Sequence, residues 1–122
     1  MDEVDLIFKR AIDALSDAEF TFLNGRYNIS INRSYYAVFY GSKALLIKKG
    51  VETTKHSGNI VKFGLEYVIN DSFDSKIAKI LSELEEDRSS ADYDFEFDAE
   101  KIQAKENLEK AKKFLEECKK FL

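Results

Sequence analysis

Apolar residues recur every three or four positions along most of the chain, which is the spacing of amphipathic helices. The first run places six apolar residues on one face: Val4, Phe8, Ala11, Leu15, Ala18 and Phe22. Asp2 is placed to cap this run, and Asn24-Gly25 supplies a left-handed stop after it. The pattern therefore predicts a first helix between Asp2 and Asn24.

The second predicted helix, from a Ser30 cap to Gly50, has three faces instead of two. One face is apolar, with Ile31, Tyr35, Val38, Phe39, Leu45 and Leu46. A second consists of small residues, Ser34, Ala37, Gly41 and Ala44. The third combines polar and aromatic side chains, Asn32, Arg33, Tyr36, Tyr40 and Lys43. We expect neighbours on all sides of this central helix, with another helix close to its small face.

Two further helices are expected before residue 93. A third helix runs to about Asn70, and its candidate caps are Thr53, Thr54 and Ser57. A fourth helix runs through an apolar stripe to about Asp92, and its candidate caps are Ser72 and Asp74.

The segment YDFEFD alternates aromatic and acidic residues, but no partner strand is expected elsewhere in the chain. We interpret it as an ordered loop held by Phe95 and Phe97. Asp98 then caps a last helix whose stripe is Ala104, Leu108, Ala111, Leu115, Cys118 and Leu122. The prediction is an all-α, antiparallel up-and-down bundle of four to five helices, forming a single domain over residues 1–122.

Composition agrees with a soluble helical domain. The chain has 122 residues, no proline and five glycines, and a net charge of −4 that repels nucleic acid except at a local patch. Its acidic N-terminus is unlike a signal peptide, and no run is long enough to span a membrane. We therefore expect a cytoplasmic protein without membrane contact.

Several classes of site are excluded by residue type. With one histidine and one cysteine, the chain has no ligand set for a zinc cluster, and it has no Gly-rich phosphate loop. No Glu-x-x-His pair occurs, which excludes a ferritin-like di-iron core. We expect no metal and no cofactor, and a buried, unreactive Cys118.

Arg88 is the most unusual residue of the fourth helix because it lies in register with Leu81 on the inward stripe. A buried charge is costly unless it is paired, and Asp92 follows one turn later. Two interpretations remain open. Arg88 and Asp92 form a surface ion pair, or Arg88 binds an anion such as an RNA phosphate in a cleft between helices.

Arg33, Tyr36 and Tyr40 lie together on the third face of the central helix, with Lys43 further along. Cations interleaved with aromatic rings suit stacking on bases and contacts to phosphate, although aromatic residues are also common at subunit interfaces. The lone histidine, His56, is a candidate general acid or base. The alternative is a polar residue at a helix entrance that performs no chemistry.

Five segments in this order resemble the HEPN domain family (higher eukaryotes and prokaryotes nucleotide-binding) of the short stand-alone prokaryotic type. They are NGRY at 24–27, NRSYYAVF at 32–39, ALL at 44–46, KHSG at 55–58 and RSSADY at 88–93, before a long C-terminal helix. The resemblance covers essentially the whole chain. It implies a helical bundle that forms a homodimer and often acts beside a small nucleotidyltransferase in a two-gene, toxin–antitoxin-like module.

Many HEPN proteins are metal-independent ribonucleases whose motif is an arginine followed, after four to six residues, by a histidine, assembled across the dimer. Arg88 matches the arginine, but Tyr93 stands at the histidine position, and neither Asp94 nor Phe95 restores it. Phe95 also replaces the tyrosine that partner transferases modify in some members. The resemblance therefore implies the family's fold more directly than its catalysis.

The leading hypothesis is a module that acts with a nucleotidyltransferase partner and binds nucleotide or RNA, without strong catalysis of its own. The site residues that it assigns are Arg33, Tyr36, Tyr40, Arg88, Asp92 and Tyr93. The first alternative is a metal-independent endoribonuclease toxin that uses Arg88 with Tyr93 or His56. The second alternative is a purely structural helical adaptor.

Overall fold

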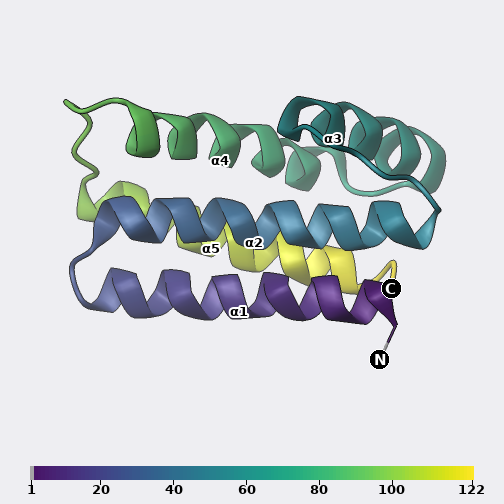
Figure 1. The fold of residues 1–122 in the computed structure, drawn as a ribbon, viewed down its shortest axis with the longest axis horizontal. Coiled ribbons are helices and arrows are strands. Elements are labelled where there is room, and N and C mark those ends of the chain that lie inside the picture. Colours follow the sequence, from purple (N-terminus) through teal and green to yellow (C-terminus); the bar gives the residue numbers. More distant parts are fainter. Residues whose placement is uncertain (1) are drawn as a thin grey trace.

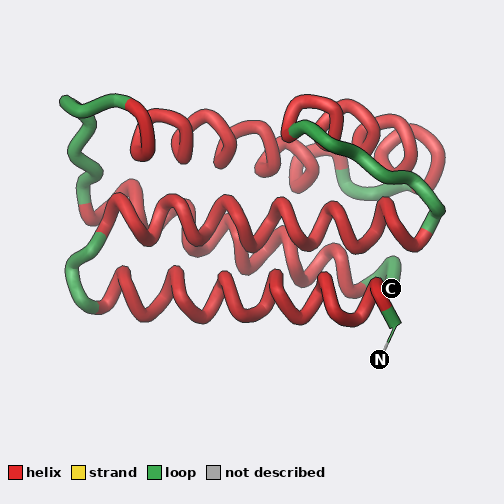
Figure 2. Tube along the Cα trace, viewed as in Figure 1, coloured by secondary structure: helices red, strands yellow, loops and turns green. Residues whose placement is uncertain are grey.

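The computed structural model describes residues 2–122 and confirms the all-α prediction. The helices are α1 (Glu3–Leu23), α2 (Tyr27–Lys48), α3 (His56–Phe63), the π-helical segment η1 (Gly64–Ile69), α4 (Ser75–Tyr93) and α5 (Lys101–Lys119). The described residues contain no strand, and short loops join the helices (Figure 2). Four long helices and one short helical unit therefore make up the bundle.

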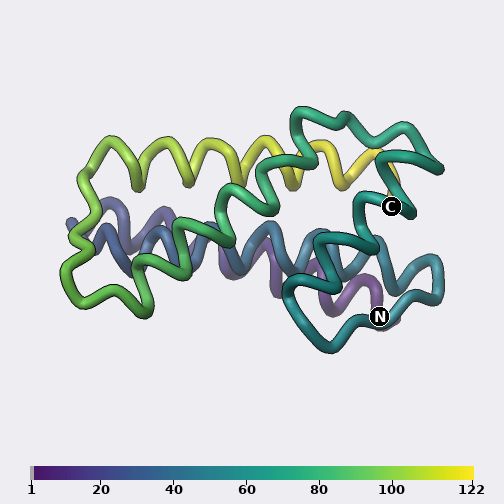
Figure 3. Tube along the Cα trace, turned by 90° about the horizontal axis from the view of Figure 1, so that it is seen from above, coloured from purple at the N-terminus to yellow at the C-terminus, as the bar shows by residue number. Residues whose placement is uncertain are grey.

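Helix α2 is the centre of the bundle, as its three faces predict. It packs against α1, α5, α4 and α3. In Figure 1, α1 and α2 form an antiparallel hairpin, α5 lies behind them, and α4 and α3 cover the other side of α2. The view from above shows α4 running across the hairpin while α5 follows its flank (Figure 3). Helix α2 therefore has neighbours on several sides.

The small face of α2 permits the close approach of α5. A Cβ atom added to Gly41 would lie 2.6 Å from Leu115 Cδ2 and 3.5 Å from Cys118 Sγ. Ser34, Ala37 and the other small residues of this face are fully buried. The prediction that another helix meets this stripe closely is therefore confirmed.

Aspartate caps begin two of the helices as predicted. Asp2 accepts a hydrogen bond from the Asp5 amide at 2.8 Å, and Asp74 accepts hydrogen bonds from the Lys76 and Ile77 amides at 2.8 and 3.1 Å. Each satisfies amide groups that the first helical turn leaves without a partner. Gly50, after α2, has a φ of 74°, a left-handed conformation that glycine adopts without steric cost.

Other predicted caps are wrong. Helix α2 begins at Tyr27, and Ser30 lies buried inside it, where its hydroxyl donates to the Ala18 carbonyl of α1 at 2.8 Å. Helix α5 has Glu100, not Asp98, at its N-cap. Helix α3 begins at His56 without a side-chain cap, downstream of the predicted threonines. At Ser30 the tertiary contact with α1 replaces the local capping bond.

The loop after α4 is held by one aromatic ring instead of two. Phe97 packs in a small cluster with Ile31, Ala99 and Ala104, whereas the Phe95 side chain is fully exposed. The main core lies beneath α3 and η1, where four rings pack together: Phe63, Tyr67, Phe73 and Phe114. This core holds α3 against α2, which positions His56 beside Tyr35.

Candidate functional site

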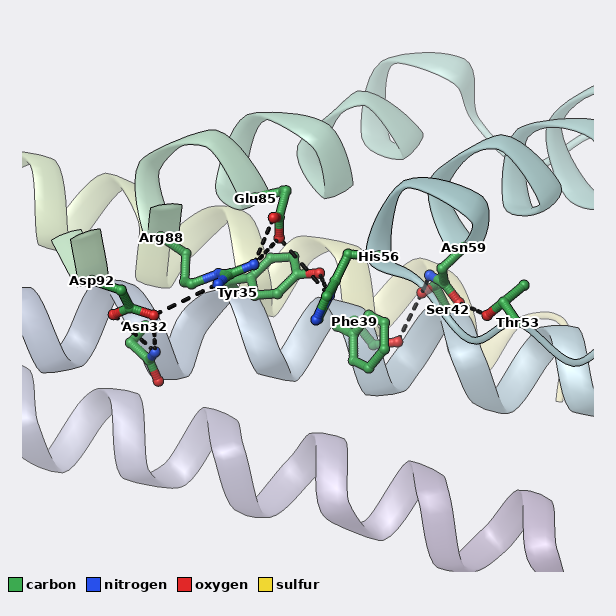
Figure 4. Close-up of polar contacts among 10 residues, drawn as sticks. All are labelled: Asn32, Tyr35, Phe39, Ser42, Thr53, His56, Asn59, Glu85, Arg88 and Asp92. Carbon is green, nitrogen blue, oxygen red and sulfur yellow. Dashed lines mark hydrogen bonds and ion pairs between the residues drawn. The ribbon is translucent and has the colours of Figure 1, made fainter. Parts of the chain in front are cut away.

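Arg88 of α4 is buried against α2, with 6% of its surface exposed. Its Nη2 atom donates to both carboxylate oxygens of Glu85, at 2.6 and 2.7 Å (Figure 4). On its other side, Nη1 lies 3.7 Å from Asp92 Oδ2. The interpretation of Arg88 and Asp92 as a surface pair is therefore wrong, because Arg88 is inside the protein and its nearer partner is Glu85.

Aromatic rings of α2 form the floor beneath Arg88. The guanidinium carbon lies 5.0 Å from the centre of the Tyr35 ring and 5.9 Å from that of Tyr36, within the range of cation–π attraction. Burial alone would lower the pKa of Arg88, but the hydrogen bond and charge of Glu85 outweigh it and raise that pKa. The guanidinium therefore stays charged, although little water reaches it.

The guanidinium is only partly satisfied by these partners. Arginine offers five N–H donors, and every hydrogen bond that Arg88 makes within residues 2–122 comes from Nη2. Nε is buried without a partner, and Nη1 makes only the long ion pair with Asp92. A buried donor without an acceptor costs about 1–3 kcal/mol. An anion that reached this side of Arg88 would recover part of that cost.

Arg33 adds a second cation beside the same aromatic floor. Its guanidinium carbon lies 5.0 Å from the centre of the Tyr36 ring, and its Nε donates to the Asn32 side-chain oxygen at 3.0 Å. Arg33 makes no ion pair within the described part of the chain. Asn32 also donates to both oxygens of Asp92, at 2.9 and 3.1 Å, which orients that carboxylate. Two guanidinium groups therefore share the Tyr36 ring.

His56 completes the cluster from the first turn of α3. Its Nδ1 is hydrogen-bonded to the Tyr35 hydroxyl and lies 4.0 Å from Glu85 Oε2. The centre of its ring is 4.6 Å from that of Phe39. Burial, and then the hydrogen bond and charge of Glu85, raise the pKa of Tyr35, so its hydroxyl keeps its proton. Helices α2, α3 and α4 thus meet at one carboxylate.

A short polar chain fixes the link that brings His56 to this place. Thr53 donates to the Asn59 side-chain oxygen at 3.2 Å, and Asn59 donates to the Ser42 hydroxyl at 2.7 Å (Figure 4). Asn59 and Ser42 are fully buried. These bonds tie the start of α3 to the middle of α2, so the position of His56 is determined by the packing of these helices.

The structure brings together most of the residues predicted from the sequence, namely Arg33, Tyr36, His56, Arg88 and Asp92. Tyr93 lies apart from this cluster, and Tyr40 lies at its edge. Tyr93 is 72% exposed and takes part in none of these hydrogen bonds. The centre of the Tyr40 ring lies 5.9 Å from that of the Tyr36 ring. Tyr40 also lines a separate cleft of about 440 Å³ with Arg10 and Lys43.

Tyr35 and Glu85 are site residues that the sequence analysis missed. Tyr35 fits the apolar face of α2, so its hydroxyl gave no separate signal. Glu85 lies in an acidic run on α4 with Glu83, Glu86 and Asp87, and the sequence does not mark which of these carboxylates faces inward. The available signal was its spacing, because a glutamate three residues before a buried arginine is within reach of it on a helix.

Two features are absent from residues 2–122. No group of three or more His, Cys, Asp or Glu side chains is arranged to hold a metal ion. None of the described helices combines the length and apolar character needed to cross a bilayer.

Comparison with known proteins agrees with the family resemblance seen in the sequence. The family model of the HEPN domain matches residues 4–121. The chain belongs to the HEPN domain family. A UPF0332 protein of Thermotoga maritima is 33% identical over 114 residues, covering 93% of this chain and 86% of the relative.

Two relatives carry names that refer to a toxin. Both are Methanocaldococcus jannaschii proteins named "Putative toxin"; one is 31% identical over 98% of this HEPN chain and 82% of its own length. The other is 33% identical over 99% of this chain and 90% of its own length. The crystal structure of TT1696 from Thermus thermophilus superposes with a TM-score of 0.82, covering both chains completely at 18% identity. That likeness supports the HEPN fold.

Proposed function

We propose that this chain is a toxin-like HEPN module that binds RNA or nucleotide phosphate at the Arg88 cluster, with little catalysis of its own. Family membership and the toxin names of two relatives support the toxin-like role. From the family resemblance we further propose that residues 1–122 form one domain. That domain would act as a cytoplasmic homodimer beside a nucleotidyltransferase partner.

The observation that carries this proposal is the incomplete pairing of Arg88. Its Nη2 is held by Glu85, while Nε has no acceptor and Nη1 has none at hydrogen-bond distance. A guanidinium fork matches the oxygens of a phosphate as well as those of a carboxylate. Arg33, which makes no ion pair among the described residues, lies against the same Tyr36 ring and would add a second contact to the anion.

Weak catalysis follows from Tyr93. A phenol exchanges a proton near neutral pH less readily than an imidazole does. Tyr93 is also largely exposed and outside the hydrogen-bonded cluster. The chain therefore keeps the arginine of the family's ribonuclease motif without the acid–base group at the usual place.

Binding of a fluorescent single-stranded RNA in EDTA, followed by anisotropy, tests the proposal. We expect Arg88→Ala to weaken binding at least tenfold, and Arg88→Lys to restore only part of it because lysine lacks the guanidinium fork. Arg10→Ala, which removes the same charge from exposed α1, is the control. Arg88→Ala leaves the Glu85 carboxylate without its partner and could unfold the protein. The double variant Glu85→Gln/Arg88→Met removes both charges of the pair and therefore avoids an unpaired buried charge. Unchanged affinity in folded Arg88 variants would contradict the proposal and favour the adaptor.

The alternative, a metal-independent endoribonuclease, is favoured by one observation: His56 and Arg88 approach the same Glu85 carboxylate. Incubation with structured RNA in EDTA distinguishes the two functions. The binding module predicts intact RNA. Cleavage lost in both Arg88→Ala and His56→Ala, but kept in Tyr93→Phe, would establish the ribonuclease instead.

A further inference from the structure

An apolar groove of about 580 Å³ lies between the α3–η1 helix and the start of α4, on the side of the bundle away from α1 (Figure 1). One wall carries Val61, Leu65 and Ile69, which are 70%, 48% and 75% exposed. None of these three residues, the apolar row, is part of the hydrophobic core. Exposed apolar side chains usually occur singly, so a row of three along one groove indicates a binding surface.

The groove has the shape to receive a helix. Gly64 lies on one wall, and Ser75 and Ala78 lie on the other, so small residues leave room for a second backbone. A Cβ atom added to Gly64 would meet nothing within 4 Å. The wall from Ile60 to Ile69 is roughly 13 Å long at 1.5 Å per residue, which matches apolar residues at positions i, i+4 and i+7 of a bound helix.

Lysine side chains determine which charge the bound helix should carry. Lys79 is the only charged residue among the described residues that line the groove. It makes no ion pair within residues 2–122, and Glu83, one turn further along α4, pairs with Lys110 at 3.5 Å. Lys62 and Lys76 each follow a lining residue in the sequence and add positive charge beside the groove. A carboxylate is therefore the group that complements this surface.

We propose that the groove binds an amphipathic helix of another protein, which packs apolar residues on the apolar row and pairs an acidic side chain with Lys79. A second copy of this chain complements the groove less well. A two-fold contact between two grooves would place both Lys79 side chains in one apolar interface without an acid between them. The proposed homodimer would therefore use another face, and docking at the groove does not require phosphate binding at Arg88.

Fluorescence anisotropy with two designed helical peptides tests this docking. Both present leucine at positions i, i+4, i+7 and i+11, and their flanks carry glutamate in one peptide and lysine in the other. The wild type should bind the glutamate peptide about three- to tenfold more tightly at low salt, the effect of an exposed ion pair against an equal repulsion. Lys79→Glu, a change at the protein surface that keeps the fold, should reverse this preference.

Gly64→Leu tests the groove itself, because its side chain would enter the open space and block the peptide. We expect it to weaken binding of the glutamate peptide about tenfold or more, as loss of a well-packed contact does. Gly58→Leu is the matched control, since Gly58 is also helical with nothing within 4 Å of an added Cβ but does not line the groove. Circular dichroism checks that both variants are folded.

The outcomes also identify other occupants. Equal affinity of the wild type for the two peptides, or of the two glycine variants for the glutamate peptide, would overturn the proposal. Sedimentation tests for a second copy: if the wild type self-associates and Gly64→Leu separates the copies, this chain fills its own groove and the proposal is wrong. The affinity of Gly64→Leu for RNA should equal that of the wild type, so these results and those at Arg88 are independent.

Discussion

Gly41 provides a sharp test of the packing between α2 and α5. Replacing it with alanine adds a single methyl group, which would lie 2.6 Å from Leu115 Cδ2 and 3.5 Å from Cys118 Sγ. Leu115 is 1% exposed and Cys118 is fully buried, so neither side chain can turn toward solvent. The added methyl must therefore displace atoms of the core.

Two opposing effects determine the magnitude. Overpacking a core costs about 1–3 kcal/mol, whereas replacing a helical glycine with alanine stabilises a helix by about 1 kcal/mol. The net result for Gly41→Ala is a loss of about 0–2 kcal/mol in the free energy of unfolding. Gly41→Leu brings three further carbon atoms into the same space and should unfold the bundle or separate α5 from α2.

Gly58→Ala is the matched control because the residue is helical in α3 and an added Cβ would meet nothing within 4 Å. We expect this variant to gain about 0.5–1 kcal/mol. Urea unfolding followed by circular dichroism measures both variants. The difference between them isolates the overpacking cost of about 1–3 kcal/mol. Equal stabilisation of the two, or an unchanged melting temperature and mass for Gly41→Leu, would refute the close approach of α5.

Three further predictions concern single side chains. Burial raises the pKa of Tyr67 from 10.0 to about 12. The unfolded chain therefore loses this proton first, and urea unfolding should show stability falling over that pH range in the wild type but less in Tyr67→Phe. Phe95→Ser should change the free energy of unfolding by less than about 0.5 kcal/mol, whereas Phe97→Ser should cost about 1–3 kcal/mol; similar losses would contradict the loop packing. Burial raises the pKa of Cys118, so its thiol should react with a disulfide reagent only after denaturation.

Much of the fold follows from local patterns in the sequence. The three faces of α2 could be predicted because a helix repeats every 3.6 residues, which sorts side chains by direction. Asp2 and Asp74 cap their helices because that bond is made within one turn. Ser30 has the same local preference, but α1 offers it the Ala18 carbonyl instead. Local rules failed where a distant element supplied a competing partner.

In the candidate site, too, local patterns predicted some residues and contacts between distant segments determined the others. Arg88 could be predicted because a charge on an apolar stripe needs a partner. The His56–Tyr35 bond could not be predicted, because it depends on the path of the link between α2 and α3 across 21 positions of sequence. The role of Glu85 could not be predicted for another reason, because nothing in an acidic run marks which carboxylate turns inward. The sequence thus indicated a charged site at Arg88, and the fold determined that His56, Tyr35 and Glu85 belong to it.

The measurement that tests the central claim most directly is the ¹H–¹⁵N signal of the Arg88 side-chain Nε–H during titration with a short RNA in EDTA. This donor has no acceptor in the described structure, so its resonance should report the arrival of a phosphate. We expect it to shift saturably, with the dissociation constant found by anisotropy, while the Nε–H signal of Arg10 on α1 stays in place. A stationary Arg88 signal at saturating RNA would contradict phosphate binding at this cluster.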